Sequence, residues 1–224
     1  MMKLAAHMIT GIILVGMIHT TKAQTILIDN FDTGPQVISP RDPSSGTGTR
    51  VQTGSMLGGF RQVKHIVQQL PSPPTSLGRK GVYNIIGGHL IVEDGVRVAS
   101  RLEVSYGFDK EDNLIPLNLD LSNALANGKM KLHFHSLDMI NQVDAIIQLV
   151  TPSREIFQLS KPITPPVAGS FTIAFPLSAF RSGSQGKPPT KNDLKSIDYI
   201  TLILQDGGNG GNDFAIDVFD ISFN

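Results

Sequence analysis

Cysteine is absent from this sequence, and so is tryptophan. Without cysteine the chain can form no disulfide bond, no thiolate zinc site, no thiol nucleophile and no lipid anchor on a cysteine. Basic and acidic residues number 19 each, so the formal net charge is zero. The sequence therefore lacks the broad positive field of a protein that binds nucleic acid or anionic membranes. We expect no nucleic-acid partner and a fold stabilised by its hydrophobic core or by a bound ion.

The N-terminal apolar run is too short to cross a bilayer. Lys3 precedes an apolar stretch at residues 9–18, and Thr21 and Ala23 supply the small side chains of a cleavage site. This is the pattern of a secretory signal peptide, whereas a transmembrane helix needs about 20 apolar residues. We predict a signal peptide over residues 1–23, a mature chain from Gln24, an extracellular or periplasmic location and no membrane insertion. The absence of Asn-x-Ser/Thr sequons, together with the lack of cysteine, favours a bacterial exported protein.

Apolar residues recur at every second position through most of residues 24–224, in segments bounded by Gly, Pro, Asn and Asp. Met130, Leu132 and Phe134, for example, alternate with lysines and histidines, which predicts a half-buried strand. Short helical turns are expected only near residues 121–126 and 177–180. The spacing predicts one all-β domain of about nine or ten strands, a sandwich or barrel in which two antiparallel sheets face each other. Besides the strand at residues 129–135, the expected strands are residues 25–31, 62–69, 82–92, 96–106, 143–150, 155–159, 170–175, 198–205 and 213–223.

The connections between these strands carry their own signals. Residues 33–53 and 70–81 are polar and contain several prolines, so both are expected to be long surface loops. Asp94-Gly95 suits the positive φ of a tight turn and predicts a hairpin between residues 82–92 and 96–106. Residues 206–213 are predicted to be a hairpin loop joining the last two strands. The alternative is one copy of a calcium-binding nonapeptide repeat, although a single copy cannot stack into a β-roll.

The order of four short segments resembles the galactose-binding-like jelly rolls. The segments are residues 27–32 (LIDNFD), 57–61 (LGGFR), 120–122 (DLS), and the pair 197–200 (IDYI) and 213–217 (DFAID). The sequence is most similar to exported bacterial members and to the complex I intermediate-associated proteins, with noncatalytic carbohydrate-binding modules as more distant relatives. The resemblance implies a jelly-roll sandwich that binds sugars, other ligands or proteins on a concave sheet or in its end loops. Sugar-binding relatives generally stack a sugar ring on Trp or Tyr, and this chain has only Tyr83, Tyr106 and Tyr199.

The same resemblance implies a structural calcium ion where the first and last strands meet. Asp29 and Asp32 lie at the first predicted strand, and Asp217 and Asp220 lie on the last. Calcium takes roughly six to eight oxygen ligands, which adjacent terminal strands could supply together. We therefore predict a calcium site from these four acids. The alternative is that they are ordinary outward-facing strand and turn residues.

Histidines form a second candidate for metal or ligand binding. His133 and His135 share one face of a predicted strand, so both imidazoles could reach the same ligand. A third metal ligand is not evident from the sequence, although His65 and His89 could approach in space. The alternative is a solvated polar face, which two histidines more often mark.

Sequence motifs of catalysis are missing. The chain contains no Gly-x-Ser-x-Gly elbow, no His-Glu-x-x-His, no phosphate loop and no nucleotide-binding glycine pattern. We predict a secreted, noncatalytic module that presents a concave face and loops to a glycan or an extracellular protein. Alternative functions are a structural or assembly protein of the cell envelope or extracellular matrix, and a carbohydrate-active enzyme without a recognisable motif. The expected ligand contacts are polar residues that alternate with core positions, namely His133, His135, Gln148, Tyr199 and Gln205.

Overall fold

The computed structural model describes residues 23–38, 47–69, 81–95, 98–111, 113–138, 142–163, 169–206 and 211–223. The predicted signal peptide lies outside the described residues except for Ala23. The first strand starts at Gln24, the predicted first residue of the mature chain. No helix in the described part of the chain is long and apolar enough to span a membrane.

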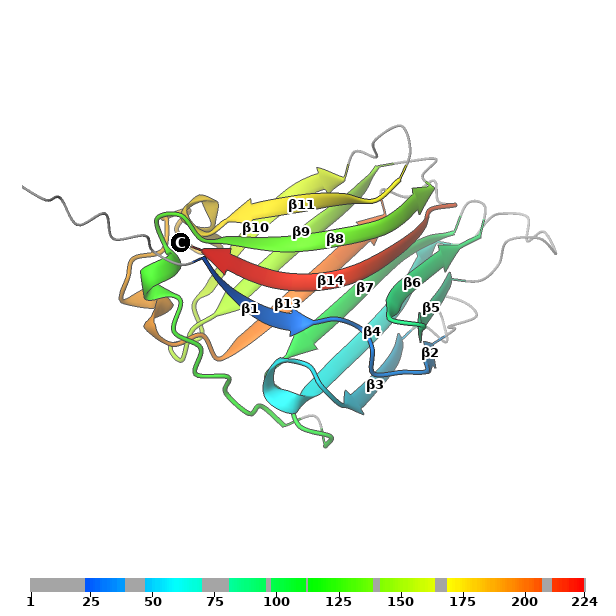
Figure 1. The fold of residues 1–224 in the computed structure, drawn as a ribbon, viewed down its shortest axis with the longest axis horizontal. Coiled ribbons are helices and arrows are strands. Elements are labelled where there is room, and N and C mark those ends of the chain that lie inside the picture. The colour runs from blue at the N-terminus through cyan, green and yellow to red at the C-terminus, as the bar shows by residue number, and fades with distance from the viewer. Residues whose placement is uncertain are drawn as a thin grey trace, which may run out of the picture.

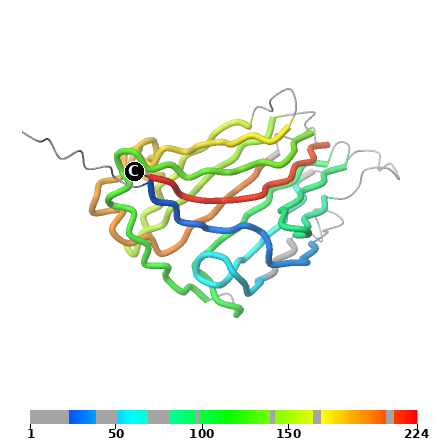
Figure 2. The backbone as a smooth tube through the Cα atoms, in the orientation of Figure 1, coloured from blue at the N-terminus to red at the C-terminus, as the bar shows by residue number. Residues whose placement is uncertain are grey.

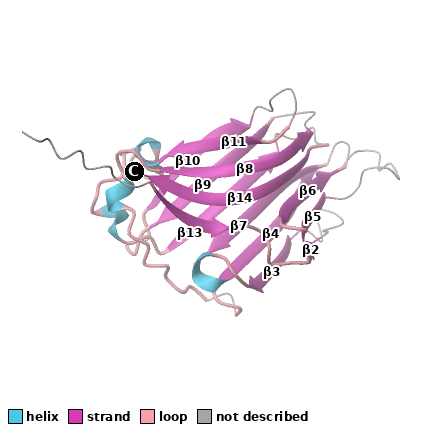
Figure 3. Cartoon of the chain, in the orientation of Figure 1, coloured by secondary structure: helices cyan, strands magenta, loops and turns pink. Residues whose placement is uncertain are grey.

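Strands are nearly all of the regular secondary structure in the described residues, which confirms the predicted all-β class (Figure 3). The helices are single 3-10 turns, and two of them lie where helical turns were expected. These turns are η1 (Leu57–Gly59), η2 (Ser122–Ala124), η3 (Leu177–Ala179) and η4 (Asp193–Lys195). The strands are β1 (Gln24–Asp29), β2 (Gln36–Ile38), β3 (Thr47–Thr53), β4 (Phe60–Gln69), β5 (Gly81–Ile86), β6 (His89–Asp94), β7 (Ala99–Tyr106), β8 (Lys129–Asp138), β9 (Val143–Val150), β10 (Ile156–Ile163), β11 (Phe171–Pro176), β12 (Arg181–Ser182), β13 (Tyr199–Asp206) and β14 (Asp213–Phe223).

These strands form two seven-stranded antiparallel sheets that face each other, so the predicted two-sheet sandwich is confirmed (Figure 1). Sheet A has the order β11-β8-β14-β6-β5-β2, with β1 also paired to β14. Sheet B has the order β12-β10-β9-β13-β7-β4-β3. The blue β1 runs beside the red β14, as the tube in Figure 2 also shows, with Gln24 opposite Phe223. The first and last strands therefore meet, as the resemblance implies.

The hydrophobic core lies between the two sheets and follows the alternation in the sequence. Met130, Leu132 and Phe134 of β8 are all buried in it, while the residues between them face outward from sheet A. On sheet B, Ile200, Leu202 and Leu204 of β13 fill the same layer from the other side. Each sheet thus has one buried face and one outer face, and a ligand can reach only the outer faces and the loops.

The hairpin predicted around Asp94-Gly95 is wrong. Residues 82–92 are not one strand, because β5 and β6 form their own hairpin through Gly87 and Gly88. Both glycines have positive φ, 62° and 79°, which the tightest two-residue hairpin turns require at both positions and which glycine adopts without steric cost. Asp94-Gly95 instead connects β6 of sheet A to β7 of sheet B.

Two other predicted connections also differ from the structure. The predicted loop at residues 33–53 contains β2 and β3, each of which is an edge strand of its sheet, and its residues 39–46 lie outside the described residues. Edge strands are often short and polar because this limits aggregation, so their sequence resembles that of a loop. Strands β13 and β14 belong to different sheets, so they do not form the predicted hairpin. Residues 207–210 of the predicted loop lie outside the described residues. The predicted loop at residues 70–81 lies outside the described residues except for Gly81.

Candidate functional site

Asp29, one of the four predicted calcium ligands, points into the core instead of into solvent. Its carboxylate Oδ2 lies 2.5 Å from Nη1 of Arg61 and accepts a hydrogen bond from the Tyr106 hydroxyl at 2.9 Å. The backbone N–H of Phe31 donates to the other oxygen at 2.8 Å. The side chains of Arg61 and Asp29 are 0% and 1% exposed. This buried ion pair joins two of the segments that carry the family resemblance, residues 27–32 and 57–61.

The other three predicted calcium ligands lie apart from Asp29. Asp32 is exposed and accepts a hydrogen bond from the side chain of Asn30. Asp217 and Asp220 lie on β14 and contact histidines across the outer face of sheet A. In the described part of the chain, the one group of three metal-ligating side chains within mutual reach includes Asp217 but not Asp29, Asp32 or Asp220. Calcium binding by the four acids stays a prediction.

Two breaks in strand register shape the outer face of sheet A. Along β14 and β8, Ala215 is opposite Ser136 but Ile216 is opposite Phe134, so His135 is an extra residue on β8. Val218 is then opposite His133, so Asp217 is an extra residue on β14. Such bulges bend a strand locally and redirect its side chains. The two extra residues lie close together on adjacent strands of sheet A.

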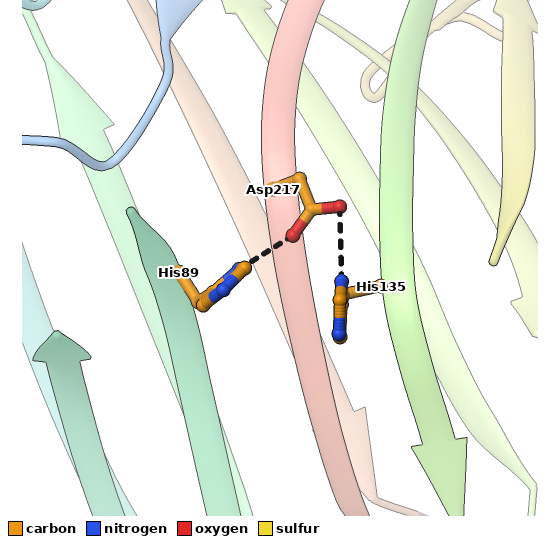
Figure 4. Close-up of side chains that lie close together, drawn as sticks. All are labelled: His89, His135 and Asp217. Carbon is orange, nitrogen blue, oxygen red and sulfur yellow. Dashed lines mark hydrogen bonds and ion pairs between the residues drawn. The ribbon is translucent and has the colours of Figure 1, made fainter. Parts of the chain in front are cut away.

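His89, His135 and Asp217 form a group that we call the histidine cluster (Figure 4). The Nδ1 atom of His89 lies 2.6 Å from Oδ1 of Asp217, and Nδ1 of His135 lies 3.5 Å from Oδ2. The centroids of the two imidazole rings are 4.7 Å apart. His89 is the first residue of β6, directly after the Gly87-Gly88 turn, so the β5–β6 hairpin positions one member of the cluster. One carboxylate therefore contacts two imidazoles, and the three side chains come from three different strands.

His133 belongs to a separate group on the same face. Its Nε2 atom lies 2.8 Å from Oδ2 of Asp220, and its Nδ1 atom lies 3.0 Å from the hydroxyl of Thr172. The bulge at His135 separates the two histidines of β8, so each contacts a different aspartate of β14. His65 does not join either group, because it lies on β4 and is fully buried.

A groove of about 380 Å³ runs beside the histidine cluster on the outer face of sheet A, and His89 and His135 line part of it. Asp213, Glu93 and Asp138 line another part, and Asp213 is directly opposite the other two acids on the neighbouring strands. Burial raises the pKa of Asp213 above its usual value, and the nearby charges of Glu93 and Asp138 raise it further. Three carboxyl groups thus lie together along the groove, and a bound cation would relieve their mutual repulsion.

The remaining predicted ligand residues, Gln148, Tyr199 and Gln205, lie on the outer face of sheet B. Gln148 belongs to a row of directly opposed side chains that crosses five adjacent strands. We call this set the polar row, and its members are Gln158, Gln148, Thr201, Ser105 and Gln62. Within it, Nε2 of Gln148 donates to Oε1 of Gln158 at 3.1 Å, and the hydroxyls of Ser105 and Thr201 are 2.9 Å apart.

Tyr199 and Gln205 flank the polar row at opposite ends of β13. The ring centroid of Tyr199 is 5.8 Å from that of Phe108. Gln205 accepts a hydrogen bond from Arg101 at 3.4 Å, and Arg101 also donates to Glu103 at 2.7 Å. Four members of the polar row were not predicted from the sequence, because choosing them requires the strand register. Their alternation with core residues was the available signal.

No protein-family model matches this sequence, and no curated protein matches it. Among solved structures, the chain is similar to the family 11 carbohydrate-binding module of a cellulosomal cellulase of Clostridium thermocellum. The two sequences are 15% identical, the alignment covers 90% of this chain and 95% of that chain, and the TM-score is 0.43. A family 30 carbohydrate-binding module from a cellulosomal cellulase of the same organism gives 11% identity, 83% and 96% coverage and a TM-score of 0.40. An agarase gives 14% identity and a TM-score of 0.43, over 63% of this chain and 23% of that chain. Similarity at this level assigns neither a family nor a ligand to this chain.

Proposed function

We propose that this protein is a secreted, noncatalytic binding module that holds a neutral glycan on the outer face of sheet B. The polar row is the observation that carries this proposal. It places amide and hydroxyl groups side by side on five adjacent strands. Neighbouring strands are about 4.8 Å apart, so the row is roughly 19 Å long. That length suits a chain of several sugar rings better than one small molecule.

The chemistry of the polar row suits sugar hydroxyls. A sugar hydroxyl both donates and accepts hydrogen bonds, and so do the side chains of Gln, Ser and Thr. The five members of the row are uncharged, which fits a neutral ligand, and the exposed Arg181 of β12 lies beyond its end, opposite Gln158. The hydrogen bonds from Gln148 to Gln158 and between Ser105 and Thr201 hold these groups in place before a ligand arrives. Preorganised polar groups lose less conformational entropy on binding.

Tyr199 provides the aromatic surface that sugar rings commonly contact. Tyr83 and Tyr106 are fully buried, so Tyr199 is the one tyrosine of the chain on an outer face. It lies partly exposed beside Phe108 and in the strand that carries Thr201. The aromatic ring would pack on the apolar face of a sugar while the polar row binds its hydroxyls.

Glu103 is a carboxylate close to the polar row, and it is already engaged by a neighbouring side chain. Glycoside hydrolysis generally requires two carboxyl groups on either side of the bond that is cleaved. Glu103 lies one row away from Ser105 on β7, and its carboxylate accepts a hydrogen bond from Arg101 at 2.7 Å. The geometry of the described residues does not place a second carboxyl group across the polar row from Glu103.

We expect Gln148→Ala and Tyr199→Ala each to weaken glycan binding by about tenfold. The first variant removes a hydrogen-bonding side chain, and the second removes a ring that packs on the glycan. Affinity electrophoresis in gels with neutral polysaccharides, including mixed-linked β-1,3-1,4-glucan and agarose, measures the change for the bound polysaccharide. Lys129→Ala on the outer face of sheet A is the matched control, since Lys129 is exposed on the opposite side of the sandwich. Its retardation by the polysaccharide, relative to a gel without polysaccharide, should equal that of the wild-type protein.

Other results would contradict this proposal. Retention of a polysaccharide that both sheet B variants leave unchanged would place the glycan site elsewhere. Failure to bind any polysaccharide, with stable recovery of one extracellular protein from native secretions, would support an assembly protein of the envelope or matrix. Release of reducing sugar from a retained polysaccharide would show an enzyme instead.

A further inference from the structure

We propose that the histidine cluster binds a divalent transition-metal ion, with zinc as the first candidate. This site lies on the outer face of sheet A and is independent of the glycan site on sheet B. Two imidazoles and one carboxylate are ligands that zinc and its neighbours in the first transition series prefer. Calcium and magnesium prefer oxygen ligands alone, so this set of side chains selects against them.

The three side chains are close enough to share one ion. Their ligand atoms all lie within 4.8 Å of one another. In a tetrahedral zinc site with bonds of about 2.0–2.2 Å, two ligand atoms are roughly 3.3–3.6 Å apart. The Nδ1 atom of His89 and Oδ1 of Asp217 are 2.6 Å apart, so these two atoms would have to separate by roughly 0.7–1.0 Å to reach that spacing. The side chain of His135 is 59% exposed and is free to rotate toward the same ion. His89 and Asp217 are each about one-third exposed, so they remain accessible to an incoming ion.

The backbone supports the same assignment. His135 and Asp217 are the extra residues of two bulges on adjacent strands of sheet A, and His89 follows a turn of two glycines with positive φ. Regular pairing of β8 with β14 has no place for either extra residue, and bulges are found preferentially where a strand redirects functional side chains. The cluster therefore results from three local departures from regular β-structure that converge on one point.

The groove next to the cluster would supply the rest of the coordination sphere. The three ligands come from one face of a sheet, which leaves the position above them for water or an oxygen atom of a ligand. Glu93, Asp138 and Asp213 line the same groove and attract cations toward it. The open position makes this site suitable for a metal that contacts a further ligand, and not only for a structural ion.

The test is a titration of the purified protein, produced without a histidine tag, with zinc chloride by isothermal calorimetry. We expect one zinc ion per chain, and at least a tenfold loss of affinity in His89→Ala, His135→Ala and Asp217→Asn. His133→Ala is the matched control, because His133 is on the same strand and face but contacts Asp220 instead. It should keep the wild-type affinity. Cobalt chloride as a second probe should give a visible absorption band that His135→Ala removes.

Thermal unfolding provides a second measurement for any variant that folds poorly. Zinc at a hundredfold excess over its dissociation constant should raise the melting temperature of the wild-type protein by about 5–10 °C. Calcium chloride at the same concentration should not act through this cluster.

The proposal is overturned if zinc fails to bind with a defined stoichiometry, or if His133→Ala weakens binding as much as His135→Ala. A response to calcium that Asp217→Asn removes, with none to zinc, would overturn it in favour of an oxygen-ligand site. None of these results would bear on the proposed glycan site, because that site lies on sheet B and shares no residue with the histidine cluster.

Discussion

Arg61→Met should lower the free energy of unfolding by about 3–5 kcal/mol, because it leaves the carboxylate of Asp29 buried without its cation. The two side chains are at most 1% exposed, and the ion pair is 2.5 Å long. Arg61 also donates hydrogen bonds to the backbone oxygen of Thr33, at 2.8 Å, and to the side chain of Gln52. Chemical denaturation followed by circular dichroism measures the change.

A double variant separates the unpaired charge from the loss of packing. In Arg61→Met combined with Asp29→Leu, no buried charge remains, and a buried ion pair replaced by apolar residues is often close to neutral in stability. We therefore expect the double variant to recover most of the stability that Arg61→Met loses. A double variant as unstable as the sum of the two single variants would show that the pair contributes mainly through shape and hydrogen bonds.

Acidification from pH 6.5 to pH 4 should remove about 3 kcal/mol of stability through His65 alone. Burial lowers the pKa of His65 from 6.5 to about 4, against a smaller opposite contribution from the backbone of Ile38. Between these values the unfolded chain binds a proton that the folded chain does not, so a fall in pH favours unfolding. This contribution to stability is complete above pH 6.5 and is lost progressively down to about pH 4.

A comparison of variants isolates this effect from the titration of the carboxylates. The difference in stability between the wild-type protein and His65→Leu should change by about 3 kcal/mol across that pH range, because the leucine variant lacks the titrating ring. His135→Ala is the control, since its ring is 59% exposed. A difference between wild type and His65→Leu that stays constant with pH would contradict the assignment.

If both proposed sites are correct, the sandwich presents two unlike ligand surfaces on opposite sides. The polar row on sheet B combines uncharged donors and acceptors, while the groove on sheet A combines imidazoles with carboxylates. The hydrophobic core separates the two surfaces, and no residue is shared between them. A variant on one face therefore provides a control for an experiment on the other.

Strands with regular alternation could be predicted from the sequence, because burial on one face of a sheet imposes a period of two residues. The strand β8 and the contact between β1 and β14 were predicted in this way or from the family resemblance. Strands β2 and β3 were not predicted, because they lie in a polar stretch with several prolines that is typical of a loop. The Gly87-Gly88 hairpin was missed even though two adjacent glycines are a strong turn signal, because the longer apolar run around them was interpreted as one strand.

The sequence by itself determined the β class, the two buried faces and the core that joins them, because these follow from the order of polar and apolar residues along each strand. Only the tertiary structure decided which sheet each strand joins, and therefore which polar residues share a face. It divided the five predicted ligand residues between sheet A and sheet B, and it turned Asp29 toward Arg61 in the core. It also brought His89 to His135 and Asp217, which are far from it in the chain. Such contacts depend on the register between distant strands and on bulges within them, and one residue of shift moves a side chain to the opposite face.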